Sequence, residues 1–270
     1  MIKDITLGQF FPGTSKIHRM DPRVKLALTF FLIIFIFVAD TVAATALTVA
    51  AVLALIKMTR VPFQMYIRGL KAILLIVLFT SVLNIFYVRT GHVLIEWGIL
   101  RITVDGVLRS IRIAVRIAIM ILLSSVLTYT TSPTDLTTAM ERLMKPLKVL
   151  HVPVHEIAMM MTIALRFVPT LLEETDKITS AQKARGADME SGNVIQRMKA
   201  MIPILIPLFV SAFRRAYELA MAMECRCYNG GDHRTTMKQL KIRPLDIWAL
   251  IISGIFCVGV ILCNFIPPHM

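Results

Sequence analysis

The stretch "IAMMMTIALRFVPTLLEETDKITSAQKARG", residues 157–186, changes character halfway along its length. Its first half is apolar and rich in methionine, and its second half is polar with charges of both signs. The same order returns in "MIPILIPLFVSAF", residues 201–213, followed by "RRAYELAMAMECRCYNGG", residues 214–231. These patterns predict two long helices, over 154–185 and 194–228, with apolar halves on a membrane core and polar ends in the cytoplasm.

Prolines and arginines inside both stretches argue against plain membrane-spanning helices. A proline removes a hydrogen bond from a helix interior, and an arginine is costly in lipid. The prolines are Pro169, Pro203 and Pro207, and the arginines are Arg166, Arg214 and Arg215. We therefore expect kinked helices in this part of the chain.

The composition is that of an integral membrane protein. Of the 270 residues, 56% are hydrophobic and 17% are charged, whereas soluble domains are about 45–50% apolar and about 25% charged. The net charge of +13 raises the question of nucleic-acid binding. The basic residues are spread along hydrophobic segments without an aromatic-interleaved basic face, so we expect no nucleic-acid partner.

Five further segments are candidates to cross a bilayer, which takes about 20 apolar residues. They are residues 24–38, 42–56, 72–88, 107–127 and 247–266. The first two meet at Ala39-Asp40-Thr41 and predict a tight helical hairpin. We expect an all-α polytopic membrane protein with a membrane region over 1–130, a cytoplasmic coupling region over 131–244 and a C-terminal transmembrane helix over 245–270.

The basic residues also predict the orientation. They gather before the first span and between the second and third, whereas residues 89–106 hold only Arg89 and Arg101. Because basic residues favour the cytoplasmic side, we expect the N-terminus in the cytoplasm and the 89–106 loop outside.

The motif "TSPTDL", residues 131–136, predicts a helix start. Ser132 suits the N-cap, Pro133 suits the first helical position, and Asp135 can reach back to the cap. Apolar residues then recur at helical spacing as far as Leu147, which predicts an amphipathic helix along the membrane surface.

The two long helices form a weak repeat with an offset of 41 residues, which aligns Arg185 with Arg226. At this offset Glu173 and Glu174 fall on Arg214 and Arg215, acids against bases. We predict that these residues pair if the helices cross about three turns before their tips.

Each tip has two readings. A basic residue followed by glycine is an ordinary helix C-terminus. Two such arginines in one insert also suit exposed points that enter acidic or carbonyl-lined pockets on partner proteins, because guanidinium stays charged and offers a rigid set of donors.

We expect neither a catalytic nor a metal site. The chain lacks the phosphate-loop pattern and the common hydrolase and zinc-protease patterns. His151, His155 and Glu156 lie close in sequence, but Pro153 is predicted to break the helix between the histidines. Cys225 and Cys227 are too close together for a zinc knuckle.

Three arginines, Arg109, Arg112 and Arg116, lie on one face of the fourth span. We expect them to reach lipid headgroups. The alternatives are contact with a partner subunit and pairing with Glu96 or Asp105.

Four stretches resemble the transmembrane (T) component of energy-coupling-factor (ECF) transporters. They are "FFPGTSKIHRMDPRVKL" (10–26), "TSPTDLTTAMERLMKPLK" (131–148), "ALRFVPTLLEETDKITSAQKARGAD" (164–188) and "AMECRCYNGGDHRT" (222–235). The resemblance implies a non-enzymatic subunit in a prokaryotic plasma membrane. It would couple two cytosolic ABC-type ATPases, which bind ATP and Mg, to one or several interchangeable substrate-binding membrane (S) subunits for uptake of vitamins or other micronutrients. No cofactor is implied in this chain.

The resemblance also implies two coupling helices, crossed in an X, that each end in an Ala-Arg-Gly-like motif seated in one ATPase. Ala184, Arg185 and Gly186 match this motif, whereas Cys225-Arg226-Cys227 keeps only the arginine. The difference suggests two unlike ATPases. The methionine-rich halves would then repack against an S subunit; the alternative is an ordinary core stripe.

Two other functions remain as alternatives. A stand-alone secondary transporter needs discontinuous helices and ionisable residues at the membrane midplane, and none of the five spans has an obvious ionisable residue near its centre. A membrane-embedded metalloenzyme would have to use the incomplete cluster at His151–Glu156.

Overall fold

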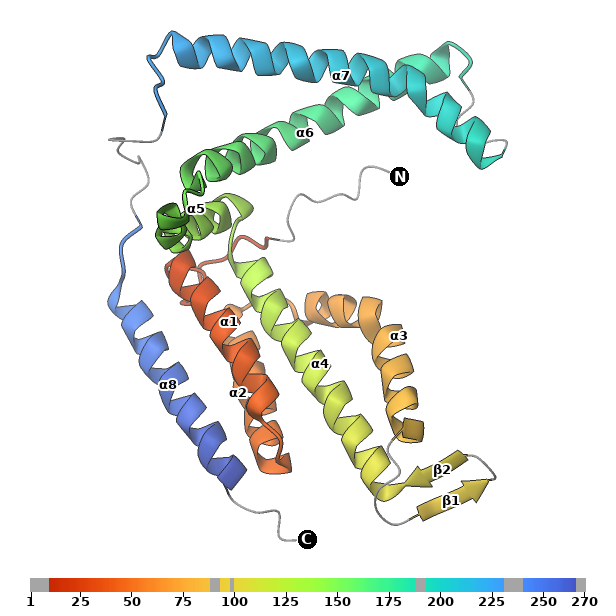
Figure 1. The fold of residues 1–270 in the computed structure, drawn as a ribbon, viewed down its shortest axis with the longest axis vertical. Coiled ribbons are helices and arrows are strands. Elements are labelled where there is room, and N and C mark those ends of the chain that lie inside the picture. Colours follow the sequence, from red (N-terminus) through yellow and green to blue (C-terminus); the bar gives the residue numbers. More distant parts are fainter. Residues whose placement is uncertain (1–9, 88–92, 98–99, 188–192, 231–239, 266–270) are drawn as a thin grey trace. The chain divides into compact units, whose positions relative to one another are not determined.

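The computed structural model describes residues 10–87, 93–97, 100–187, 193–230 and 240–265. The regular secondary structure of the described chain is helical except for one short antiparallel hairpin, so the all-α prediction is confirmed (Figure 1). The helices are α1 (Pro22–Val38), α2 (Val42–Thr59), α3 (Phe63–Tyr87), α4 (Val104–Thr130), α5 (Pro133–Leu143), the 3-10 helix η1 (Lys145–Leu150), α6 (Val154–Ala184), α7 (Val194–Glu224) and α8 (Pro244–Phe265). The hairpin pairs β1 (Val93–Trp97) with β2 (Leu100–Thr103), inside the segment predicted as a plain loop.

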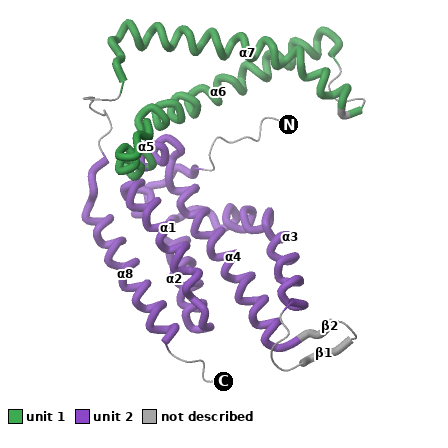
Figure 2. Tube along the Cα trace, viewed as in Figure 1, with its two compact units in different colours: residues 1–7, 140–238 green, residues 8–139, 239–270 purple. Residues whose placement is uncertain are grey.

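The chain divides into two compact units, which Figure 2 colours separately. The bundle unit comprises the described residues of 8–139 and 239–270, and thus α1 to α4 with α8. The crossed-helix unit comprises the described residues of 140–238, and thus α6 and α7 with η1. The C-terminal helix therefore belongs to the same unit as the first four helices.

Six helices of the described chain are long and apolar enough to cross a membrane: α2, α3, α4, α6, α7 and α8. The prediction of about five spans is therefore close. The described residues of all five predicted segments lie within helices, although α1 is too short, at 17 residues, to belong to the six. The helices α6 and α7 meet the same criteria of length and composition.

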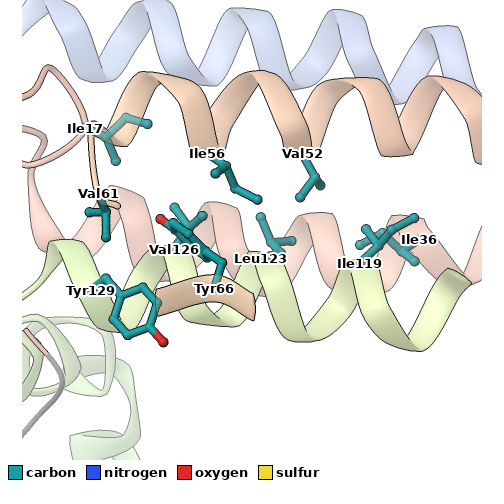
Figure 3. Close-up of a cluster of buried hydrophobic side chains, with 10 residues drawn as sticks. All are labelled: Ile17, Ile36, Val52, Ile56, Val61, Tyr66, Ile119, Leu123, Val126 and Tyr129. Carbon is teal, nitrogen blue, oxygen red and sulfur yellow. The ribbon is translucent and has the colours of Figure 1, made fainter. Parts of the chain in front are cut away.

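The core of the bundle unit lies where α1, α2 and the start of α3 meet α4 (Figure 3). Its aromatic centre is Tyr66, 1% exposed, whose ring packs edge-on against Tyr129 with centroids 5.1 Å apart. Both hydroxyls have partners: Tyr66 Oη lies 3.0 Å from Thr59 Oγ1, and Tyr129 Oη donates to the Met65 carbonyl. The aliphatic residues around them are Ile17, Ile36, Val52, Ile56, Val61, Ile119, Leu123 and Val126.

The turn into α1 is fixed by buried charges. The Asp21 side chain caps the helix by accepting the Arg23 N–H at 2.9 Å, and the Arg23 guanidinium donates to the same carboxylate. Burial alone would raise the pKa of Asp21, but the hydrogen bonds from Arg23 outweigh it and hold the pKa below its ordinary value. The fully buried Asp246 at the start of α8 accepts the Asp21 N–H at 2.9 Å. The first turns of α1 and α8 are thus joined.

The other end of α8 holds the turn between α1 and α2. Asn264 Oδ1 accepts the N–H groups of Asp40 and Thr41 at 3.1 and 3.2 Å, and its Nδ2 donates to the Val38 carbonyl. Arg116 reaches this turn from α4, 2.6 Å from the Ala39 carbonyl and 3.0 Å from Asp40 Oδ1. The acidic partner of Arg116 is therefore Asp40, and not Asp105 as one alternative had it.

The segment after α4 begins as predicted but does not continue as one helix. Ser132 Oγ accepts the Asp135 N–H at 3.1 Å, and α5 starts at Pro133. The amphipathic pattern that reaches Leu147 is divided, because α5 ends at Leu143 and a 3-10 helix with Pro146 in its first turn follows. Pro153 separates η1 from α6, so the predicted break between His151 and His155 is present.

Candidate functional site

The two long helices α6 and α7 cross within the crossed-helix unit and run in opposite directions (Figure 1). Gln182 Nε2, near the end of α6, lies 3.5 Å from the Pro203 carbonyl in the first part of α7. Two turns back along α6, Glu174 contacts Ser211 and Arg215, which lie further along α7. The residue numbers of these contacts decrease along α6 while they increase along α7, so the two helices are antiparallel.

One ion pair joins the two helices at this crossing. Arg215 Nη2 lies 3.1 Å from Glu174 Oε2, and Ser211 Oγ donates to the other carboxylate oxygen. Among the described residues, Glu173 and Arg214 form no ion pair with each other; both are exposed. The structure thus joins one acid and one base of the four predicted residues. Sequence reasoning missed Ser211, which lies one turn before Arg215 on the same helix face.

The paired residues are equivalent members of the repeat, because Glu174 and Arg215 are 41 positions apart, as are Arg185 and Arg226. Equivalent residues of two antiparallel helices meet where a local two-fold axis passes between them. Identical residues at this point would place like charges together. The inversion from Glu174 to Arg215 makes the contact attractive.

Beside the ion pair, α6 and α7 enclose an apolar hollow of about 240 Å³, and Arg215 is one of its lining residues. Ile163, Phe167 and Leu171 line it from α6, one helical turn apart. Small residues of α7 face them, including Ala212, Ala216 and Ala220. The helices therefore separate toward the far end of α7 instead of packing along their whole length.

The tip of α6 is closed by a Schellman motif, a pair of hydrogen bonds around a left-handed residue. The Ala187 N–H donates to the Gln182 carbonyl and the Gly186 N–H donates to the Lys183 carbonyl, both at 3.0 Å. Gly186 has φ +86°, and a Cβ there would meet nothing within 4 Å. The backbone conformation, and not space, is thus what favours glycine. Arg185 is the C-cap residue of the helix.

The tip of α7 has the same hydrogen bonds at equivalent positions. The Tyr228 N–H donates to the Met223 carbonyl at 3.0 Å, and the Cys227 N–H donates to the Glu224 carbonyl at 2.8 Å. Cys227 takes the left-handed position with φ +53°. Arg226 therefore has the same place relative to its cap as Arg185, although its neighbours differ.

Both tips are open to solvent in the described structure. All six residues of the two predicted motifs are exposed: Ala184, Arg185, Gly186, Cys225, Arg226 and Cys227. Neither Arg185 nor Arg226 forms an ion pair within the residues that the structure describes. Two guanidinium groups thus stand at helix ends, with carbonyl groups of the last turn beside them.

The two tips lie on opposite sides of the crossing. Each arginine follows the paired residue on its own helix by eleven positions, which is about 16 Å at 1.5 Å per residue. Since the helices run in opposite directions, Arg185 and Arg226 are about 30 Å apart. That separation suits two different contact sites better than one.

The remaining candidates lie elsewhere. His155 Nδ1 is 2.9 Å from Glu141 Oε1, so this histidine has a carboxylate partner within the crossed-helix unit. Within the described chain, no group of three or more His, Cys, Asp or Glu side chains is placed to hold a metal ion. The four cysteines are free, and only Cys257 is buried.

Comparison with known proteins gives a consistent result. Residues 13–237 match the family described as cobalt transport protein (CbiQ). A protein of Ruminiclostridium cellulolyticum named "Energy-coupling factor transporter transmembrane protein EcfT" is 51% identical over 266 residues, covering 98% of this chain and 99% of the relative. A protein of the same name from Bacillus subtilis is 47% identical over 240 residues, or 89% of this chain and 91% of the relative.

Proposed function

The chain belongs to the cobalt transport protein (CbiQ) family, and we propose that it couples two cytosolic ATPases to a substrate-binding membrane subunit. The two relatives compared with it are named as transmembrane proteins of energy-coupling factor transporters. It is a multi-pass membrane protein with helices long and apolar enough to span a bilayer. In this proposal the chain is not itself an enzyme, and the partner ATPases bind ATP and Mg.

One observation carries the proposal: a single antiparallel helix pair presents two similarly capped arginines at opposite ends. Each guanidinium is exposed and about 30 Å from the other. Each would enter an acidic or carbonyl-lined pocket on one ATPase, where a fixed set of donors and a permanent charge favour binding. Because Cys225 and Cys227 replace the small neighbours found at the first tip, the two ATPases would be unlike.

The helix pair would act as a mechanical link. Movement of the ATPases during ATP binding and hydrolysis would displace the two tips relative to each other. The ion pair of Glu174 with Arg215 would hold the crossing, so the displacement would reach the apolar halves of both helices. Exposed methionines on those halves, among them Met160, Met161 and Met201, would repack against a substrate-binding subunit, because methionine is unbranched and adapts to varied surfaces.

The substrate and the orientation are part of the same proposal. The substrate would be a vitamin or another micronutrient, recognised by one or several interchangeable S subunits. The N-terminus would lie in the cytoplasm, as the basic residues near the first spans indicate.

A purification and a charge reversal test the proposal. The full chain, isolated from its host membrane under mild conditions, should bring two nucleotide-binding subunits with it. In the double variant Arg185→Glu and Arg226→Glu, both subunits should be lost and uptake abolished, while membrane insertion persists. The matched control is Arg214→Glu, an exposed arginine of α7 near the crossing and twelve positions before Arg226, which should retain both subunits. Uptake by the purified chain alone after reconstitution would instead support a secondary transporter.

A further inference from the structure

The bundle unit contains a hollow of about 320 Å³ between α1, α2, α4 and α8. It follows α1 from Lys25 to Ile36 and α2 from Thr48 to Met58, which is about 15 Å of helix at 1.5 Å per residue. A hydrocarbon core about 30 Å thick consists of two leaflets, so this length matches one leaflet. The hollow thus has the length of one acyl chain.

The polar groups in the wall of the hollow are already satisfied. Hydroxyls of four lining residues donate to backbone carbonyls of their own helices: Thr29, Thr48, Thr130 and Ser253. The Lys25 ammonium donates to the Thr130 carbonyl at 2.9 Å and to Thr131 Oγ1 at 3.1 Å. With these donors engaged, the hollow offers an apolar surface, and a hydrocarbon ligand fits it.

The hollow opens between α2 and α8. Ala54 and Met58 of α2 and Ile252 of α8 line it and are exposed. The two helices are antiparallel, because Thr41 at the start of α2 bonds the Cys263 carbonyl near the end of α8. The last turn of α2 therefore neighbours the first turns of α8, and both border the mouth of the hollow.

Basic and aromatic residues lie at the helix ends that border this mouth. Lys57 and Arg60 end α2, Lys241 and Arg243 precede α8, and all four are exposed. Among the described residues none of these four side chains forms an ion pair. Trp248, 63% exposed, lies in the first turns of α8. Basic residues with an exposed tryptophan are typical of the level of lipid headgroups.

We propose that this hollow binds one acyl chain of an anionic phospholipid, with the lipid phosphate held by the basic residues at the mouth. The apolar wall supplies affinity for the chain, because each CH₂ group that it buries is removed from water or lipid headgroups. The four cations select an anionic over a zwitterionic headgroup. A lipid held in this way fills the space enclosed by α1, α2, α4 and α8.

Photocrosslinking of the full chain in membranes tests the site directly. The probe is phosphatidylglycerol with a diazirine in one acyl chain, and phosphatidylcholine with the same chains is the comparison. Crosslinks from phosphatidylglycerol should concentrate in residues 48–58 and 249–256 relative to the exposed lipid-facing residues of α3. Labelling that follows side-chain exposure alone, with α3 labelled at least as strongly, would overturn the proposal.

Two matched pairs of variants sharpen the test. Ala54→Phe should block the mouth and abolish the concentrated crosslinks, whereas Ala72→Phe, at an exposed residue of α3, should leave them. The double variant Lys57→Gln and Arg60→Gln should reduce the preference for phosphatidylglycerol about 30-fold, and Arg68→Gln with Lys71→Gln should preserve it. Inorganic phosphate should leave the concentrated crosslinks in place, because the acyl chain is held by the apolar wall. Loss of these crosslinks in phosphate would show that the headgroup alone holds the probe, and would refute the acyl-chain site.

Discussion

The tips of α6 and α7 have the same backbone conformation but different side chains. At the end of α6, Gly186 has φ +86° and follows Arg185; at the end of α7, Cys227 has φ +53° and follows Arg226. Both tips are closed by the same two backbone hydrogen bonds. The cap therefore sets the position of the arginine, and the identity of the following residue affects only how readily the cap forms.

The physical cost of the second tip follows from chirality. An L-residue with a Cβ in the left-handed region costs about 1 kcal/mol or more relative to glycine. Cys227 bears this cost, and Gly186 does not. The second cap should therefore open more often than the first, unless a bound partner stabilises it.

The largest effect, on binding of the ATPases, should come from reversing the charge of one tip arginine at a time. Arg185→Glu should release one ATPase and Arg226→Glu the other, because each arginine would serve its own pocket. Truncating a desolvated charge contact costs about 2 kcal/mol or more, so the affinity of the affected subunit should fall about 30-fold or more. Co-purification with quantified subunit ratios measures this. Loss of the same ATPase subunit in both variants would contradict the proposal that each arginine binds a different ATPase.

A smaller effect should follow from placing a side chain at the first cap. Gly186→Ala should weaken the cap by about 1 kcal/mol, because the left-handed backbone no longer suits the residue. Hydrogen exchange of the Ala187 amide should then be about fivefold faster. Cys227→Ala is the control, since it exchanges one L-residue for another and should leave the Tyr228 amide unchanged. If Cys227→Ala accelerated exchange of the Tyr228 amide as much as Gly186→Ala accelerates exchange of the Ala187 amide, the two caps would not differ in this way.

The converse change should strengthen the second cap. Cys227→Gly removes the cost of the left-handed Cβ, and exchange of the Tyr228 amide should slow by about fivefold or less. Glycine also restores the residue type found at Gly186, so we expect ATPase binding to be retained. Loss of binding in Cys227→Gly would instead give the thiol itself a role in the contact.

The smallest effect, on uptake, should come from changes to the ion pair of Glu174 with Arg215 at the helix crossing. Glu174→Arg or Arg215→Glu alone should lower uptake by less than about fivefold, because a partly exposed ion pair contributes little. The double exchange should restore uptake, since it keeps opposite charges at the crossing. The same exchange at Glu173 and Arg214, which are not paired with each other, should show no such rescue. A rescue there and not at Glu174 and Arg215 would place the crossing one residue away.

Much of the fold could be read from the sequence. Apolar length and the cap residues place the described residues of all five predicted spans within helices, because both signals are local. The 3-10 helix after Leu143 was not predicted, since apolar spacing alone does not show where a proline divides a helix. The hairpin of β1 with β2 was missed because a two-stranded hairpin lies within a loop between membrane helices.

Residue type and spacing are sufficient to predict the two helices, their arginine ends and the charge inversion at Glu174 and Arg215. Tertiary structure decided which acid meets which base, since only the antiparallel crossing brings Glu174 to Arg215. It also decided that Arg116 serves the turn at Asp40, and that α8 fixes both ends of α1 through Asp246 and Asn264. Such contacts join residues far apart in sequence and depend on packing, which leaves no local signal.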